Sequence, residues 1–338
     1  MMSSSYIFCQ APTKISAVLL CYEKEVEAGN KVTIVTKNSV SMNSFFRKLE
    51  LNATVVHLES IKYEKYCLAH FFAIKKIVRK DIENLGICHD ANVRIFFTDI
   101  CDDFWMGLYL SELKQFPIIK IQGEIDIKRN LDRCWDRRNL PFKLRIKERL
   151  FSLFFGYSFF YTNIDHWTLA INIKKYNYPL LDYSDKSVCN RYLISAPSQF
   201  EHSVLFFTEP YRNKFQTEDD YMRLNKLIII ELQKKGYKVG VKGHPRIGLP
   251  NGIRNLADFE VESYLPAEFI DMKSYDFVIG FVSTSISSAS NQIPAYSVLP
   301  MCQIIDEKQV DYWYDYLNTL SANKVFYLND LNDISNVD

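Results

Sequence analysis

Short apolar runs that alternate with amphipathic helical stretches are the feature that most limits what this chain can fold into. In the first 125 residues, the runs that read as strands lie at 6–10, 31–37, 53–59, 92–99 and 116–124. The same alternation starts again later, with runs at 203–209, 237–245, 259–263, 275–281, 301–305 and 324–328. Strands and helices that alternate at this length form βαβ units with parallel strands. The sequence therefore predicts an α/β fold with two doubly wound domains that face a central cleft.

The length of the chain agrees with two domains, because 338 residues are too many for one ordinary hydrophobic core. We expect a first domain at 1–180, which includes a connecting region, and a second at 181–338. Helices are expected over 13–28 (begun by Thr13 and ended by Gly29), 218–236 (ended by Gly236), 266–274 (begun by Pro266) and from 283. In doubly wound sheets, ligands bind beyond the carboxyl ends of strands. The polar clusters of this sequence follow predicted strands.

Composition excludes several classes of protein. The net charge of +1 argues against a dedicated nucleic-acid binder. None of the eight cysteines forms a CxxC pair, which argues against a zinc site. Several cysteines lie inside apolar runs, as in a reduced, cytosolic protein. No run reaches the roughly 18 apolar residues that a membrane-spanning helix needs, so we expect a soluble or peripheral protein.

The connecting region differs from the rest of the chain. Residues 128–149 hold nine Lys or Arg and three acidic residues, and the stretch that follows, 150–163, is almost entirely apolar and aromatic. A basic amphipathic segment beside an aromatic one is typical of contact with an anionic membrane surface. The same pattern also fits a solvated helix followed by a strand of the core. The sequence leaves both interpretations open.

The stretch Lys242-Gly243-His244-Pro245-Arg246 follows an apolar strand. A histidine can donate a proton or a hydrogen bond near neutral pH, and Pro245 restricts the backbone beside it. Gly243 permits close approach of a ligand, while Lys242 and Arg246 favour an anion. The set suits a departing phosphate, although a turn with a surface histidine would give the same letters.

Two further clusters follow predicted strands. Ser283, Thr284 and Ser285 begin a predicted helix, and hydroxyls at a helix start can either bind phosphate or cap the helix. The acids are Asp99, Asp102, Asp103, Glu124 and Asp126. A carboxylate at a strand end can act as general base toward a sugar hydroxyl. Capping of the next helix is the expected role of Asp102 and Asp103.

Taken together, these stretches resemble the bacterial sialyltransferases and polysialyltransferases of the GT-B type, which have two Rossmann-like domains. Their histidine-proline motif matches His244 and Pro245, and their serine- or threonine-rich motif matches Ser283 to Ser285. The segment YLPAEFI is similar to their proline-x-glutamate segment, with Glu268 as the acid. The acidic pair followed by glycine that these enzymes carry has no counterpart here. The stretch nearest in position makes Glu124 our first choice of base, with Asp126 second and Asp99 third.

The resemblance implies an inverting glycosyltransferase that moves a nonulosonic acid, such as sialic, pseudaminic or legionaminic acid or Kdo, from a CMP donor. The acceptor would be a hydroxyl of a bacterial surface glycan or glycolipid. Lys242, Gly243, Pro245 and Ser283 to Ser285 would surround the nucleotide phosphate, with His244 as its hydrogen-bond donor and Glu268 on the ribose. It implies no metal and no cofactor besides the donor. The enzyme would be cytoplasmic, with 128–163 as the contact with the inner membrane.

Two other functions are compatible with the same sequence. One is a GT-B transferase or a sugar-nucleotide epimerase that uses a UDP- or CDP-sugar, because the two-domain fold does not distinguish donors. The other is a non-catalytic scaffold of polysaccharide assembly at the membrane edge. Stabilisation by CMP, UDP, UMP or CDP would separate the three.

Overall fold

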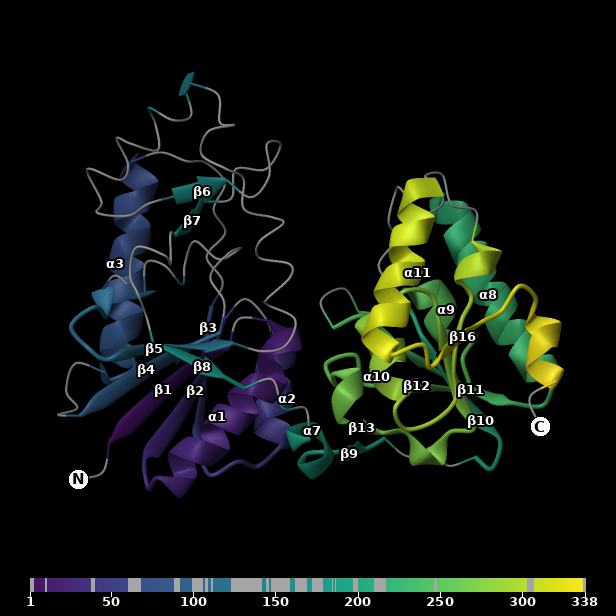
Figure 1. Ribbon diagram of the computed structural model, residues 1–338, viewed down its shortest axis with the longest axis horizontal. Coiled ribbons are helices and arrows are strands. Elements are labelled where there is room, and N and C mark those ends of the chain that lie inside the picture. Colours follow the sequence, from purple (N-terminus) through teal and green to yellow (C-terminus); the bar gives the residue numbers. More distant parts are fainter. Residues whose placement is uncertain are drawn as a thin grey trace. The chain divides into compact units, whose positions relative to one another are not determined.

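The structure, a computed structural model, consists of two compact units, Met1–Val188 and Cys189–Asp338 (Figure 1). It describes residues 3–9, 11–37, 40–59, 68–87, 92–98, 106, 109–110, 112–122, 142–143, 146, 159–161, 169–171, 179–183, 185, 187–196, 200–209, 217–245, 248–302 and 307–336. The first unit extends beyond position 180 because strand β8 (Leu180–Asp182) pairs with β5 of the same unit.

The first unit contains a six-stranded sheet with the order β3-β2-β1-β4-β5-β8. Its other strands are β1 (Ser4–Cys9), β2 (Lys31–Lys37), β3 (Thr54–Leu58), β4 (Val93–Phe97) and β5 (Ile118–Gln122). All neighbouring pairs are parallel. Helices α1 (Ile15–Glu27) and α2 (Val40–Lys48) cover one face of the sheet and α3 (Leu68–Asn84) covers the other (Figure 1). This is a Rossmann-like arrangement.

The core of this unit follows the alternation of side chains along each strand. Tyr6 and Phe8 belong to the same apolar cluster as Val78 and Ile82 of α3. Ile7, which lies between them in β1, is fully buried as well. A strand buried on both faces reads as a continuous apolar run, which explains why the pattern at 6–10 predicts a strand so clearly.

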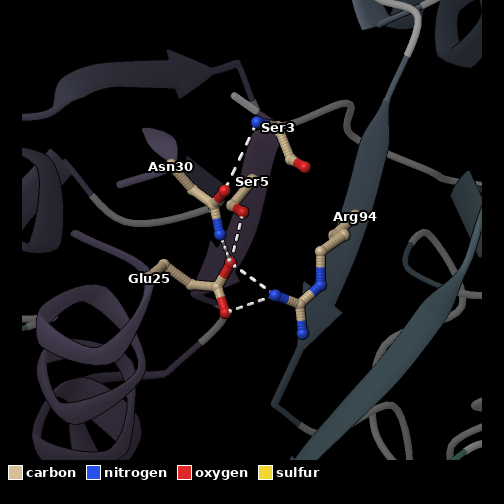
Figure 2. Close-up of polar contacts among 5 residues, drawn as sticks. All are labelled: Ser3, Ser5, Glu25, Asn30 and Arg94. Atoms are coloured by element: carbon tan, nitrogen blue, oxygen red, sulfur yellow. Dashed lines mark hydrogen bonds and ion pairs between the residues drawn. The ribbon is translucent and has the colours of Figure 1, made fainter. Parts of the chain in front are cut away.

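A buried carboxylate holds the amino end of this sheet together. Glu25 of α1 accepts hydrogen bonds from Ser5 Oγ (2.6 Å) and Asn30 Nδ2 (2.9 Å). It also accepts from Arg94 Nη1 of β4, at 2.9 and 3.0 Å from its two oxygens. Figure 2 shows the three partners converging on one carboxylate, and it also shows the Ser3 amide donating to Asn30 Oδ1. The contact ties α1 to β1 and β4 at the edge opposite the strand carboxyl ends.

The start of the first helix differs from its prediction. A 3₁₀ turn, η1 (Pro12–Lys14), precedes α1, and the residue before α1 is Lys14, which makes no side-chain cap. Thr13 therefore lies inside the turn rather than capping the helix, because Pro12 starts the turn one residue earlier. Gly29 ends the helix as predicted, with a φ of +76° in the left-handed region. A short antiparallel pair also lies in this unit, β6 (Phe159–Tyr161) with β7 (Leu169–Ile171).

The second unit has a sheet of the same kind, with the order β12-β11-β10-β14-β15-β16. Its strands are β10 (Ser203–Phe207), β11 (Lys238–Lys242), β12 (Phe259–Val261), β14 (Phe277–Gly280), β15 (Ala295–Ser297) and β16 (Val325–Tyr327). Its helices are α8 (Glu218–Lys234), α9 (Asn251–Arg254), α10 (Thr284–Ala289) and α11 (Glu307–Ser321). One apolar core joins α8 and α11 to the central strands. The predicted α/β class with two doubly wound sheets is confirmed.

One predicted helix of this unit is wrong, and one predicted strand lies mostly outside the described residues. The stretch 266–274 is a 3₁₀ turn, η5 (Ala267–Phe269), then a two-residue strand, β13 (Ile270–Asp271), then a second turn, η6 (Met272–Ser274). Strand β13 pairs with β9 (Ile194–Ser195), and this tertiary pairing interrupts the expected helix. The fifth strand of the sheet is β15, whereas the predicted strand at 301–305 begins in a 3₁₀ turn, η7 (Leu299–Met301), and its positions 303–305 lie outside the described residues. A strand of three residues is too short to show a periodic pattern.

Among the described residues, no helix is both long enough and apolar enough to cross a membrane.

Candidate functional site

The carboxyl edge of the second sheet brings the sequence motifs of this unit to one level. Phe207 of β10 pairs with Lys242 of β11 on one side and with Gly280 of β14 on the other. The chains that leave β11 and β14 therefore start level with each other, about 10 Å apart, which is two strand spacings. The chain reverses its strand order between β10 and β14, the position at which doubly wound sheets bind ligands.

Lys242 is a buried lysine at the last position of β11. It is 2% exposed, and its Nζ donates to the carbonyl oxygens of Gly243 (3.3 Å) and Ser263 (3.4 Å). Burial lowers the pKa of its ammonium from 10.5 to about 8, and the charge of the nearby Glu268 acts in the opposite direction. Burial of the charged ammonium destabilises the folded protein, and an anion bound beside it would offset that cost.

A tight loop after β11 carries His244. The His244 carbonyl accepts from the Gly248 amide (2.8 Å), and the two residues form an antiparallel bridge. Gly248 has a φ of +78°, a conformation that favours glycine. A Cβ at Gly243 would lie 2.6 Å from the Gly248 carbonyl atoms and from Ser263 Oγ. His244 and Pro245 are half-buried on this loop; Arg246 lies outside the described residues.

The acid of the proline-x-glutamate segment lies close to this loop. Pro266 precedes η5, and Glu268 is the central, half-buried residue of that turn. The Glu268 charge opposes the lowering of the Lys242 pKa, which places its carboxylate near the ammonium. The turn η5 also packs against α10. Glu268 therefore lies between the loop after β11 and the helix after β14.

Helix α10 begins with the three predicted hydroxyl residues. Ser283 is its N-cap, and the Ser283 hydroxyl accepts from the Ile286 amide at 3.4 Å. Thr284 and Ser285 form the first turn, and all three residues are half-buried. A hydroxyl that accepts in a cap keeps its own hydrogen for a bond to another acceptor. Capping and ligand binding are thus compatible roles for Ser283.

Glu209 occupies the point where the strand order reverses. It follows β10 by one residue, Thr208, whose amide donates to the Lys242 carbonyl (3.0 Å). Glu209 Oε1 accepts from the amide of Val282 at 2.6 Å, directly before Ser283. A carboxylate therefore bridges the ends of β10 and β14. The sequence analysis did not select Glu209, although its position just after an apolar strand was a usable signal.

Comparisons with known proteins give similarity to sugar-processing enzymes at low identity. The calicheamicin glycosyltransferase CalG4 is 10% identical, over 97% of this chain and 86% of that one, with a TM-score of 0.46. A glycosyltransferase of kitacinnamycin is 11% identical, over 97% and 86%, with a TM-score of 0.47. A UDP-N-acetylglucosamine 2-epimerase of Neisseria meningitidis is 11% identical, over 96% and 94%, with a TM-score of 0.44. No protein-family model matches the sequence, and no curated protein does. Because one fold hosts many activities, the site residues rather than the fold determine the function.

The acids predicted as the general base lie outside the described residues. Strand β5 ends at Gln122, and the structure does not describe Glu124 or Asp126. The same holds for Asp99, Asp102 and Asp103. In the part of the chain that is described, no three His, Cys, Asp or Glu side chains are grouped so that they could hold a metal ion. The site residues that can be placed are therefore those of the second unit.

Proposed function

We propose that this protein is an inverting glycosyltransferase that transfers a nonulosonic acid from its CMP donor to a hydroxyl of a bacterial surface glycan. The observation that carries the proposal is the register of three neighbouring strands. Lys242 and Gly280 both pair with Phe207, one on each side of it. This register puts the histidine-proline loop and the serine-threonine helix start at the edge where doubly wound sheets bind nucleotides.

The described residues offer a distinct role for each part of the donor. The Lys242 ammonium and the hydroxyls of Ser283 to Ser285 are suited to the phosphate, since both are hydrogen-bond donors. His244 would donate to the phosphate oxygen that leaves the anomeric carbon. Glu268 would accept from ribose hydroxyls, because an ionised carboxylate only accepts hydrogen bonds. The donor is a co-substrate, and we propose no metal or further cofactor.

The reaction would be a single displacement. The acceptor oxygen forms a bond to the anomeric carbon while the bond from that carbon to the CMP phosphate oxygen breaks. A carboxylate of the first unit, Glu124 in our first choice, takes the proton of the acceptor hydroxyl, with Asp126 and Asp99 as alternatives. CMP leaves with the electron pair of the broken bond, and His244 offsets its charge. The anomeric configuration is inverted because one displacement occurs.

A donor screen tests this proposal. The purified protein is incubated with CMP-sialic acid, CMP-pseudaminic acid, CMP-legionaminic acid and CMP-Kdo, and with UDP- and CDP-sugars, in the presence of glycan acceptors. We expect release of CMP from one CMP-sugar, a loss of roughly 10²–10⁴-fold in turnover for His244→Ala, and no transfer by Glu124→Gln. Release of UDP or CDP would favour the other donor class. Nucleotide binding without any release would favour neither transfer reaction.

We also propose that 128–163 contacts an anionic membrane surface. Most of this segment lies outside the described residues, but Phe142 is 70% exposed and Ile146 is 44% exposed. These apolar side chains lie among the basic residues of 128–149, a combination suited to the membrane interface. Wild type should sediment with phosphatidylglycerol vesicles and not with phosphatidylcholine vesicles. The double variant Phe142→Asp, Ile146→Asp should remain in the supernatant, and equal sedimentation of both proteins would refute the contact.

A further inference from the structure

Glu209 makes a contact that joins the end of β10 to the end of β14, directly before the serine-threonine motif. Its Oε1 accepts from the Val282 amide at 2.6 Å, and Val282 is 1% exposed. A hydrogen bond to an ionised carboxylate is stronger than a neutral one. Burial keeps water from competing for the amide. The bond therefore fixes the peptide that immediately precedes Ser283, the first of the three hydroxyl residues.

Tyr221 of helix α8 holds the backbone of Glu209 in place. The Glu209 amide donates to the Tyr221 hydroxyl at 3.0 Å, and that hydroxyl donates to the Glu209 carbonyl. Tyr221 is 3% exposed. Its own carbonyl accepts from Asn225 Nδ2 at 2.6 Å. One buried side chain thus bonds both the amide and the carbonyl of Glu209. These two bonds fix the backbone from which the Glu209 carboxylate reaches the Val282 amide.

Glu209 is half-buried, and its charge acts on two neighbouring side chains. Burial, and secondarily the charge of Glu209, raise the pKa of the Tyr221 hydroxyl and of the Cys302 thiol. A negative charge beside the phosphate of a nucleotide would be unfavourable if it faced the ligand directly. The bond to Val282 gives this charge a backbone partner instead. These observations suit a residue that acts through the main chain.

We infer that Glu209 is a positioning residue for the phosphate-binding hydroxyls. It holds the corner between β14 and α10 so that Ser283 to Ser285 stay level with the loop of His244. This inference rests on the proposed function, because it concerns how the CMP phosphate is held.

Two variants separate positioning from a direct role of the charge. Glu209→Ala removes the acceptor, whereas Glu209→Gln keeps an oxygen that can accept from Val282. We expect the alanine variant to bind CMP about 10- to 100-fold more weakly, because the buried Val282 amide loses its hydrogen-bond acceptor. Its KM for the CMP-sugar should rise more than its kcat falls. The glutamine variant should stay within about 3-fold of wild type, and Glu218→Ala, on the exposed first turn of α8, is the control.

Hydrogen exchange supplies a readout that needs no ligand. In Glu209→Ala, peptides covering Val282 and Ser283 should exchange faster, while those of β10 and β11 should keep wild-type protection. Equal CMP affinity in wild type and the alanine variant would overturn the inference and leave the proposed function intact. A glutamine variant as weak as the alanine variant would overturn it too, since charge would then matter rather than the acceptor. Failure of every cytidine nucleotide to bind wild type would overturn the proposed function itself.

Discussion

At the scale of residues, burial of the Lys242 ammonium lowers the stability of the fold, and the same group is suited to bind an anion. It is almost fully buried, and its pKa is lowered to about 8 by that burial. The unfolded chain therefore binds more protons than the folded one between about pH 8 and pH 10.5. In this window the free energy of unfolding rises with pH as far as this group is concerned. Below pH 8 the folded protein carries the full cost of a buried ammonium.

Replacing Lys242 by methionine should remove that cost. We expect Lys242→Met to be more stable than wild type by roughly 1–3 kcal/mol at pH 7, and the difference to shrink between pH 8 and pH 10. The variant should also lose its stabilisation by CMP. Urea unfolding at several pH values measures the first effect and thermal shift with CMP the second. Lys238→Met, which removes an exposed lysine of the same strand, is the control, and a pH-independent difference would contradict the assignment.

Close neighbouring atoms leave no room for a side chain at Gly243. A Cβ there would approach backbone atoms of Gly248 and Ser263 Oγ at 2.6 Å. We expect Gly243→Ala to lower the free energy of unfolding by about 1–3 kcal/mol, as overpacking does, and to weaken CMP binding because the His244 loop must move. In Gly252→Ala, the added Cβ would meet its nearest neighbour, Met222 Cε, at 3.7 Å, so this control should be neutral. Similar stabilities of the two variants would show that the loop yields without strain.

The site residues differ in how far sequence alone could find them. His244 and Ser283 follow apolar strands and carry recognisable motifs, so their position at the sheet edge is predictable. The burial of Lys242 is not predictable from the sequence, because lysine is normally exposed. Glu209 could be read as one more polar residue after a strand. Its bond to Val282 depends on β10 and β14 being neighbours, and no local pattern states which strands are adjacent.

At the scale of elements, the Glu25 carboxylate ties α1 to strands β1 and β4 of the first sheet (Figure 2). Removing its carboxylate leaves Ser5, Asn30 and Arg94 without this acceptor. We expect Glu25→Ala to cost about 2–4 kcal/mol of unfolding free energy. Glu25→Gln should cost less, because an amide oxygen still accepts from Ser5. Glu27→Ala, on the exposed end of the same helix, should change little. Urea unfolding measures all three, and a loss under 0.5 kcal/mol for Glu25→Ala would contradict the role.

Elements with a strong period were predictable and those decided by tertiary contacts were not. Strand β2 has its predicted bounds: Lys31–Lys37 is buried at six of its seven positions, which gives the apolar run seen in the sequence. Helix α8 begins at its predicted residue, directly after its N-cap, Thr217. The stretch 266–274 has the letters of a short helix, but β13 pairs with β9, more than 70 residues earlier in the chain. β15 is recognisable only as the partner of β14 and β16.

At the scale of the whole molecule, two separate alternations of strands and helices predict two sheets, and both have the strand order of a Rossmann-like unit. The division falls at Val188 and Cys189 rather than at 180, because β8 adds the last strand of the first sheet. A three-residue edge strand after a long connection has too little pattern to be assigned from sequence. The base of the proposed reaction belongs to the first unit, and the described residues that we propose to bind the nucleotide belong to the second.

This separation predicts what the second unit does alone. Residues Cys189–Asp338 have their own sheet and apolar core, so we expect the fragment to fold, to unfold cooperatively and to be stabilised by CMP to about the same extent as the full chain. Without Glu124, Asp126 and Asp99 it should release no CMP from the donor in the presence of acceptor. Thermal shift and CMP release measure the two properties, with the Lys242→Met fragment as the non-binding control. A folded fragment that ignores CMP, beside a full chain that binds it, would mean that the first unit supplies part of the nucleotide site.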